Sequence, residues 1–183
     1  KPLVIGQDPM RTEHLWQTLS RGGFFPHDRV IGSALAAIDI ALWDIKGKAQ
    51  GLPVYDLLGG RTRDKVVCYC HLQGGQGVDT EPLEEEARQR VTEGWRFLRW
   101  SLPNEGEILQ PSRAIGQAVR QFEALREAVG PEVGLCFDGH TRLSPAEAAT
   151  LCSAVEPYRP YFIEDAIRAE SPQAYRMLRQ RTR

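Results

Sequence analysis

Apolar residues in the first third of the chain recur at helical spacing. The pattern predicts a helix over residues 10–20, with Asp8 accepting from the first-turn amides and Gly22 and Gly23 ending it. Ser33 is expected to cap a second helix that runs to about Gln50. Its apolar positions are 34–38, 40–43 and 45. Because they lie almost all round the helix, we expect it to be buried on most sides. A short turn over 54–58 follows.

After residue 65 the pattern changes to short β-forming runs that alternate with helical stretches. The predicted strands are 66–72, 97–102, 133–137 and 161–163, and the predicted helices are 81–93, 112–129, 145–155 and 172–180. The spacing between strand starts suits parallel strands that are joined by crossover helices. The predicted fold class is therefore α/β, with four βα units.

Two α/β architectures fit this alternation, an open doubly wound sheet and a (β/α)₈ barrel. The segment Gly74-Gly75-Gln76-Gly77 follows the first strand, but its GGxG pattern is not the GxGxxG of a dinucleotide fold. We interpret it as a flexible loop. A closed barrel needs eight units and about 250 residues, so four units correspond to half a barrel.

Composition narrows the range of partners. The 183 residues are 42% apolar and 26% charged, which is typical of a globular protein. A net charge of -1 without a Lys/Arg block argues against nucleic-acid binding. The sequence has neither an apolar run of about 20 residues nor a signal peptide, so we expect a cytoplasmic location and no membrane partner.

The four cysteines lack the CxxC spacing of a zinc site and the density of a disulfide scaffold. They are Cys68, Cys70, Cys136 and Cys152. We interpret all four as reduced core residues.

Ionisable side chains cluster where the predicted strands end. They are His71, Arg99, Asp138, His140, Glu164 and Asp165. α/β barrels place their catalytic groups at the carboxyl ends of the strands. Asp138 and Glu164 are therefore expected at one level, where they could share a hard divalent cation. His140 would reach the same side, and Gly139 would let the backbone approach a ligand.

Each of these positions also has a structural interpretation. Asp138-Gly139 is a common turn pair, and Glu164 could be a solvated loop charge. Arg99 could form an ordinary salt bridge, and His71 could be a polar residue at a strand end. Their joint occurrence favours a functional site.

Longer segments resemble the mandelate racemase and muconate lactonizing enzyme branch of the enolase superfamily. Residues 32–48 and 51–60 are similar to the helix and linker that join its capping domain to its barrel. Residues 94–99, 136–140 and 162–165 match its second, third and fourth barrel strands. The resemblance implies that 1–60 is the helical remainder of an α+β capping domain and 61–183 the first four βα units of a (β/α)₈ barrel. The chain opens on Lys1 without a methionine, which favours a fragment.

The resemblance further implies a Mg²⁺-dependent acid-sugar dehydratase, similar to mannonate and galactonate dehydratases. Such a hydro-lyase removes the proton next to a carboxylate and eliminates water, which gives a 2-keto-3-deoxy acid. Asp138 and Glu164 match metal ligands, and His140 matches the general acid that expels the 3-hydroxyl. Arg99 matches a catalytic second-strand arginine, and His71 a substrate-binding histidine.

Some positions depart from the family pattern. Arg99 and Ser101 stand where racemases of the family carry Lys-x-Lys, which disfavours racemisation. The general base and the third metal ligand are expected beyond Arg183, so the 183-residue chain is predicted to be inactive alone. We expect the full-length protein to be a homo-oligomer that acts on a small sugar acid. The alternatives are a racemase or epimerase of a hydroxy acid, and a non-catalytic truncated paralogue or structural half-barrel.

Overall fold

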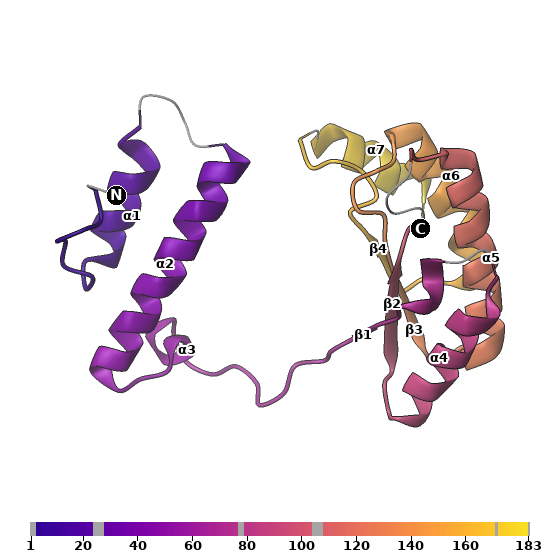
Figure 1. The fold of residues 1–183 in the computed structure, drawn as a ribbon, viewed down its shortest axis with the longest axis horizontal. Coiled ribbons are helices and arrows are strands. Elements are labelled where there is room, and N and C mark those ends of the chain that lie inside the picture. Colours follow the sequence, from indigo (N-terminus) through magenta and orange to yellow (C-terminus); the bar gives the residue numbers. More distant parts are fainter. Residues whose placement is uncertain (1–2, 24–27, 77–78, 104–107, 171, 183) are drawn as a thin grey trace. The chain divides into compact units, whose positions relative to one another are not determined.

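The chain folds as two compact units, Lys1–Val66 and Val67–Arg183 (Figure 1). The structure is a computed structural model, and it describes residues 3–23, 28–76, 79–103, 108–170 and 172–182. No helix in these ranges is long and apolar enough to cross a membrane. The predicted domain boundary after residue 60 stays a prediction.

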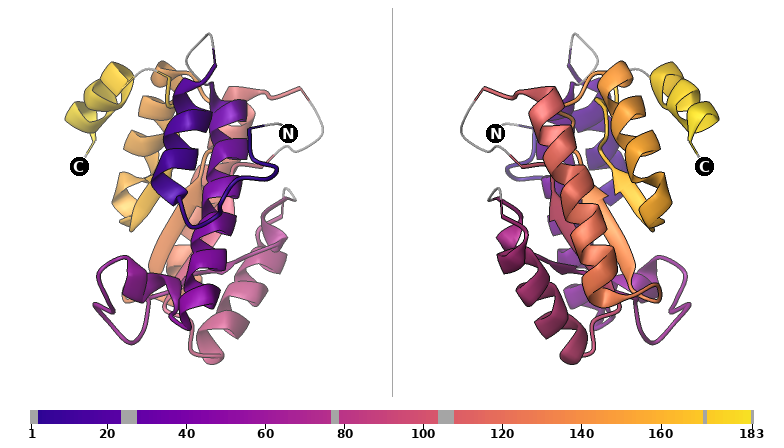
Figure 2. Two further views of the ribbon diagram at one scale, coloured as in Figure 1. Left: turned by 90° about the vertical axis from the view of Figure 1, so that its left-hand side faces the viewer. Right: turned by 90° about the vertical axis from the view of Figure 1, so that its right-hand side faces the viewer.

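The first unit is helical. Helix α1 spans Thr12–Arg21, α2 spans Arg29–Gln50 and the short α3 spans Val54–Leu57. Helices α1 and α2 run side by side (Figures 1 and 2). Their contact buries the side chains of Leu15, Leu35 and Leu42.

The predicted start of the second helix is wrong by five residues. Asp28 caps α2, because its Oδ1 accepts from the backbone N–H of Ile31 at 2.9 Å. Ser33 lies inside the helix, where its hydroxyl donates to the carbonyl of Arg29 at 2.8 Å. The first helix also begins two residues later than predicted. Asp8 accepts from the N–H of Met10 and so belongs to a separate turn before the helix.

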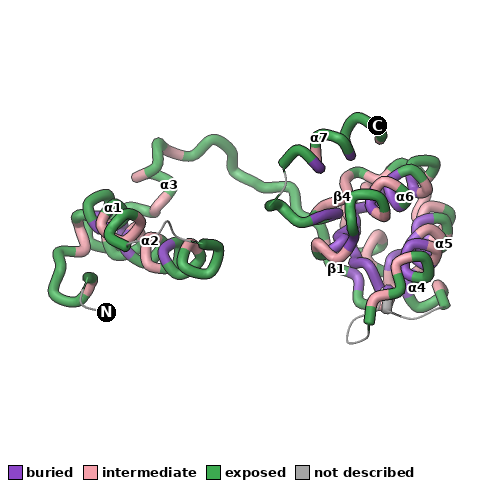
Figure 3. The backbone as a smooth tube through the Cα atoms, turned by 90° about the horizontal axis from the view of Figure 1, so that it is seen from above, coloured by how far each residue is buried: buried purple, intermediate pink, exposed green. Residues whose placement is uncertain are grey.

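The prediction that α2 is buried on most sides is also wrong within this unit. Most of α2 is exposed or half-buried (Figure 3). Its exposed apolar side chains include Val30, Ile31, Ile40 and Ile45. Helix α1 and the short α3 contact α2, and together they cover only part of its apolar surface.

The second unit is built on a parallel sheet in the order β1-β2-β3-β4. The strands are β1 (Cys70–His71), β2 (Phe97–Ser101), β3 (Gly134–Asp138) and β4 (Phe162–Glu164). This sequential parallel order confirms the predicted α/β class and the half-barrel arrangement. Strand β1 is much shorter than the predicted 66–72, because only Cys70 and His71 pair with β2. Val66 and Val67 are 72% and 77% exposed.

Helices cover one face of this sheet (Figures 1 and 2). Helix α4 spans Glu81–Thr92, α5 Pro111–Val129, α6 Pro145–Val155 and α7 Pro172–Arg181. Short 3₁₀ helices form at Gly74–Gln76 and Glu156–Tyr158. Alternate strand residues point into the helical layer, where Trp100 and Phe137 pack against Phe122 of α5. The remaining strand positions face the opposite side, which carries the polar residues.

The segment after β1 is not the flexible loop that we expected. Gly74–Gln76 forms a 3₁₀ helix that packs against the start of α4. A Cβ at Gly74 would lie 2.9 Å from the backbone of Leu83, so the close approach requires glycine. Gly77 lies outside the described residues.

The cysteines are only partly core residues. Cys136 and Cys152 are buried, whereas Cys70 is half-buried and Cys68 is exposed, so the prediction is wrong for Cys68. All four are described, and none forms a disulfide. Burial raises the pKa of Cys152 to about 11.

Candidate functional site

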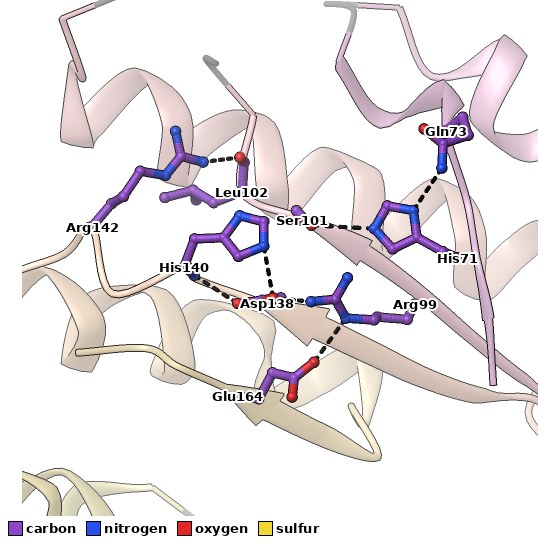
Figure 4. Close-up of polar contacts among 9 residues, drawn as sticks. All are labelled: His71, Gln73, Arg99, Ser101, Leu102, Asp138, His140, Arg142 and Glu164. Carbon is purple, nitrogen blue, oxygen red and sulfur yellow. Dashed lines mark hydrogen bonds and ion pairs between the residues drawn. The ribbon is translucent and has the colours of Figure 1, made fainter. Parts of the chain in front are cut away.

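The carboxyl ends of β2, β3 and β4 bring polar side chains to one level. Ser101 pairs with Asp138 in the sheet register, and Asp138 pairs with Glu164. Since alternate residues of a strand share a face, Arg99 and Ser101 project on the same side of β2. Figure 4 shows that Arg99, Asp138, His140 and Glu164 converge there.

Arg99 bridges the two carboxylates. Its Nε donates to Glu164 Oε1 at 2.7 Å, and its Nη2 donates to Asp138 Oδ2. The side chain of Asp138 is 4% exposed, that of Arg99 14% and that of Glu164 39%. A carboxylate as buried as Asp138 requires such a cationic partner to offset its lost hydration.

His140 follows β3 in a turn that the backbone holds tightly. Its φ of 50° and the φ of 58° at Thr141 lie in the left-handed region. The N–H of Thr141 donates to the carbonyl of Asp165 at 2.7 Å, which fixes the turn to the segment after β4. Asp138 then accepts from His140 twice, at 2.7 Å from the backbone N–H and at 2.8 Å from ring Nε2. The ring is oriented by Asp138 and remains 41% exposed.

Gly139 allows the backbone after β4 to approach closely, and the predicted approach to a ligand stays a prediction. A Cβ there would lie 2.9 Å from the carbonyl oxygen of Asp165 and 3.0 Å from the Cα of Ala166. Its N–H donates to the carbonyl of Glu164 at 3.0 Å. The glycine therefore serves the packing of the β3 end against the β4 end.

His71 lies beside this cluster rather than in it (Figure 4). Its Nε2 is 3.5 Å from the hydroxyl of Ser101, and its Nδ1 is 2.9 Å from Nε2 of Gln73. All five residues predicted for the site thus lie at the carboxyl end of the sheet. Four of them are joined by direct hydrogen bonds, whereas His71 contacts Ser101, which is in register with Asp138.

Three residues of this region were not predicted as site residues: Ser101, Gln73 and Arg142. Ser101 is buried, and the sequence signal was its alternation with Arg99 on β2. Arg142 donates from Nη2 to the carbonyls of Leu102 and Pro103, which ties the segment after β3 to the end of β2. No local pattern marks Gln73, because its role depends on the turn after β1.

Cys136 lies on the polar face of the sheet, in register with Arg99, but its protonated thiol is a poor nucleophile. Burial raises the pKa of its thiol to about 11, and the nearby Glu164 carboxylate adds to the rise. A thiol with a raised pKa stays protonated at neutral pH and is a poor nucleophile.

Two carboxylates of the cluster have the oxygen donors that a hard cation such as Mg²⁺ prefers. Asp138 and Glu164 end adjacent strands in register, so their chemistry and placement fit a shared cation. Both hold the Arg99 guanidinium in this structure. Across the described ranges no group of three histidine, cysteine or acidic residues is placed to hold a metal. These two carboxylates would supply two of the oxygen ligands of such a cation.

Two known domains match the sequence. Residues 1–59 match the mandelate racemase / muconate lactonizing enzyme N-terminal domain, and residues 82–183 match the enolase C-terminal domain-like family. A D-galactonate dehydratase of Verminephrobacter eiseniae is 41% identical over 182 residues, which cover 100% of this chain and 47% of the relative. A D-mannonate dehydratase of Sphingomonas sp. is 38% identical over 206 residues, covering 99% and 50%.

Solved structures agree with the sequence matches. An enolase from Pantoea ananatis with bound D-gluconate and Mg superposes with a TM-score of 0.84 at 32% identity, covering 99% of this chain and 51% of that one. The chain spans about half the length of the curated relatives that it matches. The two matched domains confirm the resemblance seen in the sequence: the chain belongs to the mandelate racemase / muconate lactonizing enzyme family of the enolase superfamily.

Proposed function

We propose that the strand-end cluster is part of the active site of a Mg²⁺-dependent dehydratase that acts on an acid sugar of the aldonate class. The observation that carries the proposal is the cluster at the strand ends, in which Arg99 contacts Asp138 and Glu164 and His140 contacts Asp138. The dehydratase relatives and the gluconate-bound neighbour support this substrate class.

Asp138 and Glu164 are the residues that would hold the metal. When bound, Mg²⁺ would take up the negative charge that develops on the substrate carboxylate as its α-proton leaves. Two carboxylates bind Mg²⁺ weakly, since it prefers six oxygen ligands in octahedral geometry. We therefore propose that the remaining metal ligands come from the part of the fold that the relatives have beyond the region matched by this chain.

We assign His140 the role of general acid. Hydroxide is a poor leaving group, and a histidine can donate a proton to the departing hydroxyl near neutral pH, typically a contribution of about 10²–10⁴-fold. The Asp138 carboxylate accepts from Nε2 at 2.8 Å and so fixes the direction of the ring. The exposed part of the ring leaves room for contact with a substrate hydroxyl.

Arg99 is better suited to bind charge than to remove a proton. A guanidinium stays protonated in proteins, and here two carboxylates accept from it. Its remaining N–H groups can donate to the substrate carboxylate. We therefore propose that Arg99 binds substrate, and that the general base comes from outside these 183 residues.

The proposal is tested with the product of the complete reading frame that contains these residues. We expect Mg²⁺-dependent release of a 2-keto-3-deoxy acid from one or more members of a panel of aldonic acids. His140→Asn and Glu164→Gln should each lower the turnover strongly, whereas the surface variant His14→Asn should not. Unchanged turnover in both site variants would refute the assigned roles. Proton exchange at C2 without loss of water from the unmodified protein would indicate an epimerase instead.

A further inference from the structure

The turn that follows β1 is clamped to α4 by a carboxylate. The backbone N–H groups of Gln73 and Gly74 both donate to Oε2 of Glu86, at 2.8 and 3.0 Å. Arg90, one helical turn further along α4, lies 3.7 Å from the other carboxylate oxygen of Glu86. Two donors on one acceptor oxygen fix the direction of the chain as it leaves His71.

A second clamp comes from the buried interior. Nε2 of Gln121 donates to the carbonyl of Gly75 at 2.7 Å, and its Oε1 accepts from the indole N–H of Trp100 at 3.1 Å. Gln121 is 1% exposed and Trp100 is fully buried. A buried amide with both ends satisfied is costly to displace. The turn is therefore anchored to α5 and β2 as well as to α4.

These clamps place the Gln73 side chain against one nitrogen of His71. Nε2 of Gln73 lies 2.9 Å from Nδ1 of His71 (Figure 4). An amide nitrogen only donates, so Nδ1 must accept and carry no proton. The single proton of a neutral imidazole is then on Nε2, which faces the hydroxyl of buried Ser101 at 3.5 Å.

We propose that Gln73 is a positioning residue that holds His71 as the neutral tautomer protonated on Nε2. His71 would then present an uncharged donor, suited to a hydroxyl oxygen of a polyhydroxy substrate, beside the cationic Arg99 that suits the carboxylate. The choice of substrate group rests on the proposed function. The tautomer itself follows from the contacts within this chain.

The tautomer is measured without substrate or metal. The 183-residue chain labelled with ¹⁵N-histidine is studied by long-range ¹H–¹⁵N correlation at about pH 8, where an ordinary histidine is neutral. The His71→Phe variant identifies the His71 signals by their loss. We expect an unprotonated Nδ1 and a protonated Nε2 for His71.

A variant with reversed hydrogen-bonding capacity gives the decisive comparison. In Gln73→Glu the carboxylate can only accept, so we expect the His71 proton to move to Nδ1. Gln50→Glu, an exposed glutamine in the other unit, is the matched control and should leave His71 unchanged. A protonated Nδ1 in the unmodified chain, or a Gln73→Glu spectrum identical to it, would overturn the inference. Because no turnover is measured, this result is separate from the outcome of the dehydratase assay.

Discussion

At the scale of single residues, the buried carboxylate of Asp138 organises the strand-end cluster. It accepts from the guanidinium of Arg99 and from both the backbone and the ring of His140. A buried charge of this kind is stable only while its partners are present. The same contacts that orient His140 therefore also contribute to the stability of the second unit.

Arg99→Met tests this dependence. The change leaves Asp138 buried without its cation, and we expect the free energy of unfolding of the second unit to fall by about 3 kcal/mol at neutral pH. Arg88→Met removes an exposed helical pair with Glu84 and should cost about 0.5 kcal/mol or less. Denaturant unfolding of both variants gives the comparison, and equal losses would contradict the account.

The cysteines give a prediction on thiol reactivity. Burial raises the pKa of Cys136 and Cys152 to about 11, so in the folded chain both should react slowly with a disulfide reagent at about pH 8. The exposed Cys68 should react first, and Cys68→Ser should remove this fast phase. Unfolding lowers the pKa of these two thiols back to 9.0. The free energy of unfolding that Cys136 and Cys152 contribute as neutral thiols should therefore be lost as the pH rises from 9.0 to about 11. Rapid reaction of all four thiols in the folded chain would refute the prediction.

Sequence alone could predict the positions of Asp138, His140 and Glu164, because the carboxyl ends of neighbouring parallel strands converge. It could not predict that Arg99 bridges both carboxylates, since that depends on the direction of a long flexible side chain. The contact of Gln73 with His71 could not be predicted either. It depends on hydrogen bonds that hold the turn after β1 to Glu86 and Gln121, which are distant in sequence.

At the scale of elements, Arg126 of α5 joins three segments at the amino end of the sheet. Its guanidinium donates to the carbonyl of Gly130 after α5, to that of Val133 before β3, and to those of Tyr158 and Arg159 before β4. Burial lowers the pKa of this guanidinium below its ordinary value, yet it stays cationic at neutral pH.

Replacing Arg126 by Met should leave four carbonyls without their donor. We expect a loss of about 2–3 kcal/mol in unfolding free energy, since each hydrogen bond to a charged donor contributes about 1.5–3 kcal/mol and some of the exposed carbonyls regain water. Arg120→Met, on an exposed position of the same helix, is the control and should change little. Thermal or urea unfolding measures both. A loss no larger than that of the control would show that these contacts do not stabilise the unit.

Element boundaries were predicted less well than element types. The helix that Ser33 was expected to cap begins at Arg29, because Asp28 is an equally good cap in the β-region and lies further upstream. Strand β1 was predicted too long, because the β-branched Val66 and Val67 have high strand propensity, whereas the pairing with β2 begins only at Cys70. Pairing, rather than propensity, sets where a strand begins.

At the scale of the whole molecule, the chain has two units and four βα repeats against the eight of a closed barrel. The repeat spacing and the helical periodicity allowed the α/β class to be predicted. The choice of a barrel over a doubly wound sheet rested on the resemblance, since periodicity alone does not decide the closure of a sheet.

The most direct test of the account separates proton removal from water loss in the complete protein. His140→Asn should lower dehydration of the aldonate substrate by about 10²–10⁴-fold, because the leaving hydroxyl loses its acid. Exchange of the C2 proton with solvent deuterium, followed by NMR in the same sample, should continue, because the proposed general base is a different residue. Dehydration at the unmodified rate, or an equal loss of exchange and dehydration, would contradict the role of His140.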